Sequence, residues 1–150
     1  MIYILGIVLF AFWLVWILSH LVAMYLYKPT VPSFNGFRIV IPPHLSAILN
    51  PREMTAVYLH ERGHRHHRHI WKNFALVCVF RRASARARIL QELEADDYAA
   101  QYGYAEELAS ALRKLSFEPL DNVRARRLED SSNGRRDAGD PSERDARAVD

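Results

Sequence analysis

The chain opens with a continuous apolar segment and then changes to mixed polar and apolar sequence. Only three of residues 1–27 are neither apolar nor aromatic, namely Gly6, Ser19 and His20. A helix of this length rises about 40 Å, which exceeds the roughly 30 Å core of a bilayer. The segment lacks the basic start and the small-residue cleavage site of a secretory signal. We therefore expect one membrane-spanning helix that is retained as an anchor.

A short strand is predicted next. Residues 37–41 are rich in apolar and β-branched side chains, the turn pair Asn35-Gly36 precedes them, and two prolines end the run. Proline is tolerated at a strand end because it has no N–H to donate to a sheet. The pattern indicates either a hairpin or a lone edge strand.

Helical signals dominate the remainder. Asn50 as N-cap, Pro51 at the first helical position and Glu53 at the third predict the start of a helix, which we expect to run to about residue 71. Further helices are predicted over residues 84–102, where Gly103 provides a left-handed cap, over 105–116 and from 119 to 128. The apolar run of residues 74–80 is too short to span a membrane and indicates a buried helix or an interfacial contact.

These elements divide the chain into an anchor (residues 1–27), a folded domain (28–130) and a charged tail (131–150). The tail contains four apolar residues, too few to bury the surface needed for order, so we expect it to be disordered. With one short strand among several helices, the fold is predicted to be α+β and mainly α.

Composition restricts the chemistry. Cys78 is the only cysteine, so an intramolecular disulfide cannot form and a cysteine-based zinc site is disfavoured. A metal would have to bind histidine and carboxylate groups. The net charge of +3 is too small to indicate a nucleic-acid partner.

The basic residues are nevertheless concentrated on the C-terminal side of the apolar segment. Lys28 and Arg38 follow the apolar segment, and residues 62–91 hold eight basic residues and no acidic one. Because basic flanks stay cytoplasmic, we expect the C-terminal domain to be cytoplasmic. The basic stretch is either a surface near anionic lipid headgroups or an ordinary solvated face.

The candidate chemistry is centred on H-E-x-x-H at residues 60–64. Four residues advance a helix by about 400°, so His60 and His64 project from one face and can hold one zinc ion. Glu61 is displaced by about 100°, so it can reach a zinc-bound water while remaining unligated. Gly63 in a helix suggests that another segment approaches closely there.

Two other interpretations of this segment stay open. Five of the ten residues from 60 to 69 are histidine, and a histidine-rich tract can bind metal as a buffer without catalysis. His67 also falls on the ligand face, so a pair formed by His64 and His67 is an alternative.

The second long helix supplies acidic groups. On a helical wheel, Glu92 and Asp96 fall on the apolar side, whereas Glu94 and Asp97 lie toward its edge or beyond. Buried carboxylates need a cation, so Glu92 is predicted as a third zinc ligand. Asp96 would accept a hydrogen bond from a ligand histidine and fix its tautomer. The alternative is a salt bridge between the two helices.

Together the motifs resemble those of the membrane-anchored gluzincin peptidases, the family of the CAAX prenyl proteases and HtpX heat-shock proteases. That family has H-E-x-G-H with a further histidine five residues on, as residues 60–64 and His69 do here. It also has E-x-x-A-D on a later helix, as residues 92–96 do. The resemblance covers about residues 37–128.

The resemblance implies a minimal zincin-like domain that binds Zn²⁺ through His60, His64 and Glu92, with Glu61 as general base. The chain would then be a membrane-anchored zinc endopeptidase acting on protein or peptide substrates. The multi-helix membrane chamber of the prenyl proteases is missing, so prenylated peptides are not the expected substrates.

One position departs from the family pattern. The family often has a His-Pro pair with an arginine six residues beyond the histidine, both acting on the transition state. Here the pair is Glu118-Pro119, whereas Arg124 keeps the arginine and is a candidate catalytic residue. A carboxylate cannot donate to an oxyanion unless it is protonated. A catalytically weakened, zinc-stabilised binding module tethered to the membrane is therefore the alternative function.

Overall fold

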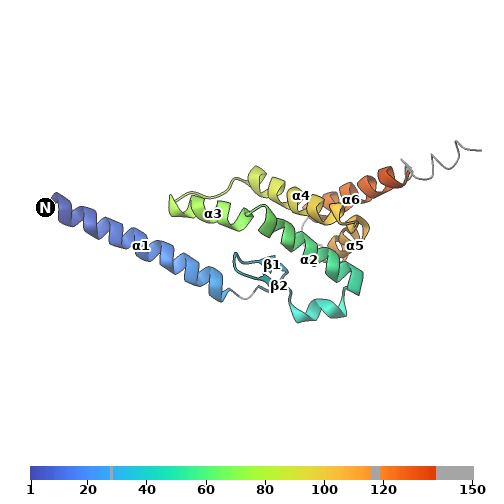
Figure 1. Ribbon diagram of the computed structural model, residues 1–150, viewed down its shortest axis with the longest axis horizontal. Coiled ribbons are helices and arrows are strands. Elements are labelled where there is room, and N and C mark those ends of the chain that lie inside the picture. The colour runs from blue at the N-terminus through green and yellow to red at the C-terminus, as the bar shows by residue number, and fades with distance from the viewer. Residues whose placement is uncertain (28, 116–118, 138–150) are drawn as a thin grey trace, which may run out of the picture.

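The computed structural model describes residues 1–27, 29–115 and 119–137. Within these ranges the protein is mainly helical, with six α-helices, one short 3-10 helix and a two-stranded sheet. The long helix α1 (Ile2–Leu26) extends away from the packed helices toward one end of the molecule (Figure 1). The prediction of a mainly helical chain with a small strand component is confirmed.

Helix α1 is long and apolar enough to cross a membrane, and none of its residues is buried. A helix with these properties near an N-terminus is a membrane anchor or a signal sequence. Its C-terminal end rests on the folded part, where the rings of Tyr25 and Phe37 meet edge to face with centroids 5.8 Å apart.

A hairpin, one of the two predicted options, follows α1. Strand β1 (Ser33–Phe34) pairs antiparallel with β2 (Ile39–Val40). In the connecting turn, the Asn35 side chain accepts two backbone hydrogen bonds of 3.1 and 2.9 Å. Gly36 has a φ of +93°, which a residue with a side chain rarely adopts. The 3-10 helix η1 (Pro43–Ala47) then leads to α2.

Helix α2 (Pro51–His66) begins as predicted and ends early. The Asn50 side chain accepts from the Glu53 backbone N–H (2.9 Å), and the Glu53 carboxylate accepts from the Asn50 N–H (2.8 Å), which completes a capping box. The predicted end at residue 71 is wrong, because Arg68 adopts a left-handed conformation with a φ of +56°. Helix α3 (His69–Cys78) starts afresh after this break.

The remaining three helices follow the predicted starts. They are α4 (Ala85–Gln101), α5 (Ala105–Leu115) and α6 (Pro119–Asp137). Helix α6 continues beyond the predicted end at residue 128, so residues 131–137 are helical and not part of a disordered tail. Contacts with α5 continue along this part, where the Ser132 hydroxyl donates to Glu106 (3.1 Å). Residues 138–150 lie outside the described residues.

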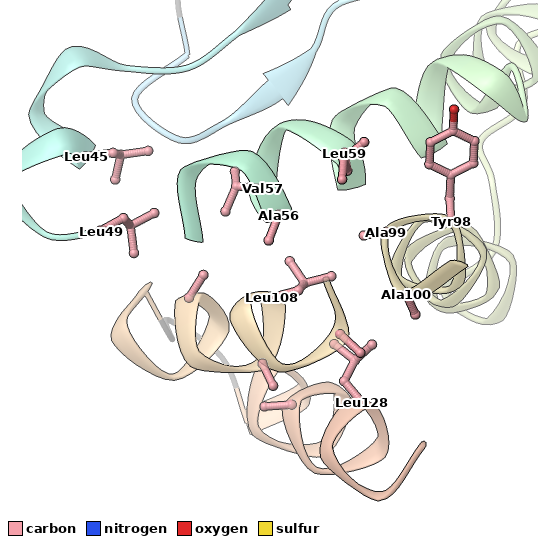
Figure 2. Packing of buried hydrophobic residues seen from close by; sticks show 14 residues of the cluster. Leu45, Leu49, Ala56, Val57, Leu59, Tyr98, Ala99, Ala100, Leu108 and Leu128 are labelled. Carbon is pink, nitrogen blue, oxygen red and sulfur yellow. The ribbon is translucent and has the colours of Figure 1, made fainter. Parts of the chain in front are cut away.

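The core lies between α2, α4, α5 and α6 (Figure 2). Leu108 points from α5 toward Ala56 and Val57 of α2, and Leu128 fills the space between the last two helices. Many of the buried positions are alanine, and several of these have no exposed surface at all. Small side chains let the helix backbones approach closely, which holds α2 and α4 at a fixed separation.

Candidate metal centre

Helix α2 presents the two histidines of the H-E-x-x-H motif toward one point. The Nε2 atoms of His60 and His64 lie 3.1 Å apart, as expected for residues one helical turn apart on one face. Their rings meet edge to face, and the His60 side chain is only 10% exposed. The predicted His60/His64 pair is therefore brought together.

Helix α4 brings Glu92 to the same point. Its Oε2 lies 3.5 Å from His60 Nε2, and its Oε1 lies 3.6 Å from His64 Nε2. Three ligands placed about 2.0–2.2 Å from a tetrahedral zinc ion lie about 3.3–3.5 Å from one another. The three residues therefore have the chemistry of a zinc site, and one donor atom from each lies within 4.8 Å of the other two.

Gly63 allows this approach of α4. A Cβ atom at Gly63 would lie 2.8 Å from the Cα of Ala95 and 3.0 Å from the Cβ of Tyr98. Backbone at that distance cannot be moved cheaply, so α2 and α4 can pack this closely only if position 63 has no side chain. The close approach suggested by the sequence is confirmed.

Asp96 supports His60 from behind. The Asp96 Oδ1 lies 3.0 Å from His60 Nδ1, the ring nitrogen that faces away from Glu92. Arg124 of α6 donates to both Asp96 oxygens, at 2.8 and 2.7 Å, and its Nη1 lies 3.2 Å from the Glu92 carboxylate. Burial raises the pKa of Asp96, but Arg124 and His60 lower it by more, so this fully buried carboxylate stays charged.

Arg124 is held at this centre by acidic side chains. Its described hydrogen bonds all go to carboxylates, with Asp121 as the third partner at 3.4 Å. The side chain also lines the central cavity. Glu118, which replaces the family histidine, lies outside the described residues.

The surroundings of the two histidines shift their pKa values in opposite directions. Burial lowers the pKa of His60, but the carboxylates of Asp96 and Glu92 raise it by more, to about 9. Burial and the neighbouring positive charge of His60 lower the pKa of His64 to about 3. Burial raises the pKa of Glu92, but His60 and other cations lower it to about 2. A metal ion that binds His60 would therefore compete with the proton on this ring.

Glu61 lies in the same cavity and is buried, with 5% of its surface exposed. Burial is the main cause of its raised pKa, and the charge of Glu92 adds to this effect. His60 lowers the pKa, as does a hydrogen bond from the Phe34 backbone of β1. A carboxyl group with a raised pKa beside a metal site is suited to accept and return a proton.

The cavity has a volume of about 670 Å³ and is lined by both polar and apolar groups. Residues 30–34, which include β1, form one wall. Residues 37–41, which the sequence predicted as a strand, do not line the cavity. The extended chain before the turn, which includes β1, forms this wall instead.

A second pair of residues, His69 and Glu94, supports His64. The Nδ1 atoms of His64 and His69 lie 2.8 Å apart, and His69 Nε2 lies 2.8 Å from the Glu94 carboxylate. His69 is 1% exposed. The left-handed turn at Arg68 folds His69 back onto α2, and no sequence signal placed that turn there. Glu94 was set aside because it lies off the apolar arc of α4.

His67 does not join His64 as an alternative ligand pair. It groups with His69 and Glu94, with its ring stacked on that of His69 at a centroid distance of 5.3 Å. The three donors lie within 4.8 Å of one another. His69 already connects His64 to Glu94, so this group is continuous with the main centre.

Comparisons of the chain with models of protein families, with curated proteins and with solved structures find no match.

Proposed function

We propose that the protein is a membrane-anchored, zinc-dependent endopeptidase with a minimal zincin-like domain of the gluzincin type. The observation that carries this proposal is the arrangement of His60, His64 and Glu92. The two Nε2 atoms lie 3.1 Å apart, and each lies 3.5–3.6 Å from one oxygen of the Glu92 carboxylate. Two neutral imidazoles and one carboxylate are a common ligand set of catalytic zinc. Glu61 shares the cavity without belonging to this set.

A bound zinc ion supplies a Lewis acid that makes water a nucleophile near neutral pH. Glu61 accepts a proton from the attacking water and returns it to the departing amine nitrogen. Its burial keeps bulk water away from this proton and raises its pKa toward the range that a general base needs.

In this proposal Asp96 and Arg124 hold the zinc ligands in position. Asp96 holds His60 in the tautomer that leaves Nε2 free for the metal. Arg124 balances the charges of Asp96 and Glu92, and it stands at the cavity wall where a developing negative charge would meet it.

The substrate in this proposal is an extended segment of a protein or peptide. Strand β1 pairs with β2 along one edge only, and residues 30–34 line the cavity. An extended backbone can add to a free strand edge, which favours unfolded or flexible substrates over folded ones.

The anchor completes the proposal. Helix α1 would be retained in the bilayer, and the basic residues that follow it favour a cytoplasmic domain.

One observation favours a second candidate, a zinc-stabilised binding module with weak or no turnover. The donors of Arg124 are engaged by carboxylates, and Glu118 stands where the family has a histidine. The metal at this centre would then have a structural role, joining α2 to α4.

The substitution Glu61→Gln separates the two candidates. Because it removes the base but no ligand, the variant should retain one zinc ion per chain and lose about 10²–10⁴-fold in the rate of casein cleavage. Glu129→Gln, the same change on α6 away from the cavity, should retain full activity. Zinc-loaded wild type that cleaves nothing would favour the binding module, and undiminished cleavage by Glu61→Gln would remove Glu61 from its role.

A further inference from the structure

The segment between α3 and α4, residues 79–82, combines exposed apolar and basic side chains. We call it the tip segment. Val79 is 59% exposed and Phe80 is 70% exposed, although both follow a helix that is otherwise partly covered. Arg81 and Arg82 come directly afterwards. Adjacent exposed apolar and basic residues of this kind are typical of a surface that meets a membrane.

The tip segment lies beside the middle of α1 (Figure 1). Trp13 Nε1 donates a 2.8 Å hydrogen bond to the carbonyl of Cys78, the last residue of α3. The rings of Trp16 and Phe80 pack with centroids 5.8 Å apart. The tip segment is therefore placed at the level of Trp13 and Trp16.

This level falls inside the bilayer if α1 spans it. A spanning helix needs about 20 residues to cross the hydrocarbon core, and α1 has 25. Every window of about 20 residues within α1, from 2–21 to 7–26, contains Trp13 and Trp16. In the shallowest placement Trp16 is five residues from the boundary, which corresponds to a depth of about 8 Å.

The backbone carbonyl groups at the end of α3 are hydrogen-bonded within the protein, as a surrounding without water requires. The last three carbonyls of the helix each accept a hydrogen bond: Leu76 from the Arg81 N–H (2.8 Å), Val77 from the Phe80 N–H (2.9 Å) and Cys78 from Trp13. To close this end, Phe80 adopts a φ of +56°, which is rare for an aromatic residue. Unpaired carbonyls would be costly in lipid, and this cap leaves none of these three unpaired.

Four arginines lie in or soon after the tip segment along the chain, namely Arg81, Arg82, Arg86 and Arg88, and Arg88 also lines the central cavity. All four are exposed, and none has an acidic partner within 4.0 Å among the residues that the structure describes. Long arginine side chains reach from a shallow apolar position to the headgroups. Each such charge near an anionic surface contributes about 1 kcal/mol of attraction.

We propose that the tip segment is a second membrane contact, in which Val79 and Phe80 enter the bilayer beside α1 and Arg81 and Arg82 bind anionic lipid headgroups. The inference rests on α1 being the anchor suggested above, but not on the zinc chemistry. It fixes the folded domain at two points of the membrane, so the domain cannot swing freely on the end of α1.

The single cysteine of the chain allows a direct test in the full-length protein. In a Cys78→Ser background, one cysteine is placed at the tip (Val79→Cys), in α1 (Phe10→Cys) or on an exposed turn of α2 (Thr55→Cys), and is labelled with a polarity-sensitive fluorophore. The proteins are reconstituted into vesicles of phosphatidylcholine and phosphatidylglycerol. Quenchers are attached to the lipid acyl chains or dissolved in the water as iodide.

Positions 79 and 10 should be quenched by the acyl-chain groups and protected from iodide, whereas position 55 should show the reverse. Adding Arg82→Glu should reduce the acyl-chain quenching at position 79, while the matched reversal Arg126→Glu on α6 should leave it unchanged. A tip probe that behaves like position 55, while position 10 is in lipid, would overturn the inference and leave the anchor intact. A water-exposed position 10 would overturn the anchor as well.

Discussion

At the scale of single residues, the contacts of His64 and His69 indicate which ring nitrogen of each histidine carries the proton. If His64 Nε2 binds a metal, its proton must sit on Nδ1, which lies 2.8 Å from His69 Nδ1. His69 then accepts at Nδ1 and carries its own proton on Nε2, which lies 2.8 Å from Glu94. Glu94 would thereby fix the tautomer of His64 at a distance, and the Asp96 carboxylate lies 3.0 Å from the corresponding Nδ1 of His60.

Replacing Glu94 tests this chain of contacts. In Glu94→Gln the acceptor for His69 loses its charge, so we expect the zinc affinity to fall by about tenfold. The affinity is measured by competition with a chromophoric chelator. Asp97→Asn is the matched control, because Asp97 is equally exposed on α4 but pairs with Arg127. Equal affinities in the two variants would contradict the role of Glu94.

The sequence was sufficient to predict the residues whose positions depend on one regular helix. His60, Glu61 and His64 follow from the period of α2, and Glu92 with Asp96 from the apolar side of α4. His69 could not be placed in this way, because its position depends on one left-handed residue between two helices. The partners of Arg124 depend on how α6 packs, which no local pattern reveals.

At the scale of elements, the contact between α2 and α4 brings the ligands together. Its closest point is Gly63 against the backbone of Ala95, one residue before Asp96 and three after Glu92. A wider separation would move Glu92 away from both histidines at once.

Gly63→Ala should therefore weaken both the fold and the zinc site. Overpacking costs about 1–3 kcal/mol, and the better helix propensity of alanine returns about 1 kcal/mol of this. We expect lower free energy of unfolding together with weaker zinc binding, measured by urea denaturation and chelator competition. Gly134→Ala is the control, since a Cβ there meets nothing within 4 Å on α6. Gly134→Ala should stabilise the protein by up to about 1 kcal/mol. A Gly63→Ala variant with unchanged free energy of unfolding and unchanged zinc binding would contradict the close packing.

The start of α2 is joined to α5 through Glu53. This carboxylate caps α2 and also accepts from the Ser110 hydroxyl (2.6 Å) and from Lys114 Nζ (2.8 Å). Burial raises the pKa of Glu53, but the bonds from Lys114, Ser110 and Asn50 lower it by more. The net result is a folded-state pKa below the ordinary value of 4.5.

This shift makes part of the stability depend on pH. Because the folded pKa is the lower one, the charged form of Glu53 stabilises the fold above about pH 4.5, and the contribution is lost as the pH falls through the folded pKa. Glu53→Gln should cost about 1–3 kcal/mol near neutral pH, and its difference from wild type should shrink as the pH falls below about 4.5. Urea titrations at several pH values measure this. A stability difference that stays constant with pH would contradict the lowered pKa of Glu53. Asp130→Asn, which changes an exposed carboxylate, is the control.

At the scale of the whole molecule, the polar centre takes its residues from α2, α3, α4 and α6, and β1 forms part of the cavity wall. The starts of α1, α2, α4, α5 and α6 follow from caps and apolar periods, and the structure confirms them within its described ranges, whereas the start of α3 at His69 was not predicted. Two features depended on packing and could not be predicted from local sequence. They are the break between α2 and α3 and the continuation of α6 along α5.

The functional interpretation depends on α2 and α4 holding the same ion. A membrane-tethered histidine-rich buffer would instead bind several ions through the tract at residues 60–69, with little need for a residue on α4. Glu92 distinguishes these two possibilities, because it is the one ligand of the proposed set outside that tract.

The most direct measurement is the zinc content per chain of the full-length protein and of Glu92→Ala, determined after dialysis against limiting zinc. We predict one zinc ion per wild-type chain and well below one in the variant, since two histidines alone leave the site incomplete. Several ions per chain, or the same content and affinity in Glu92→Ala, would contradict the proposed centre.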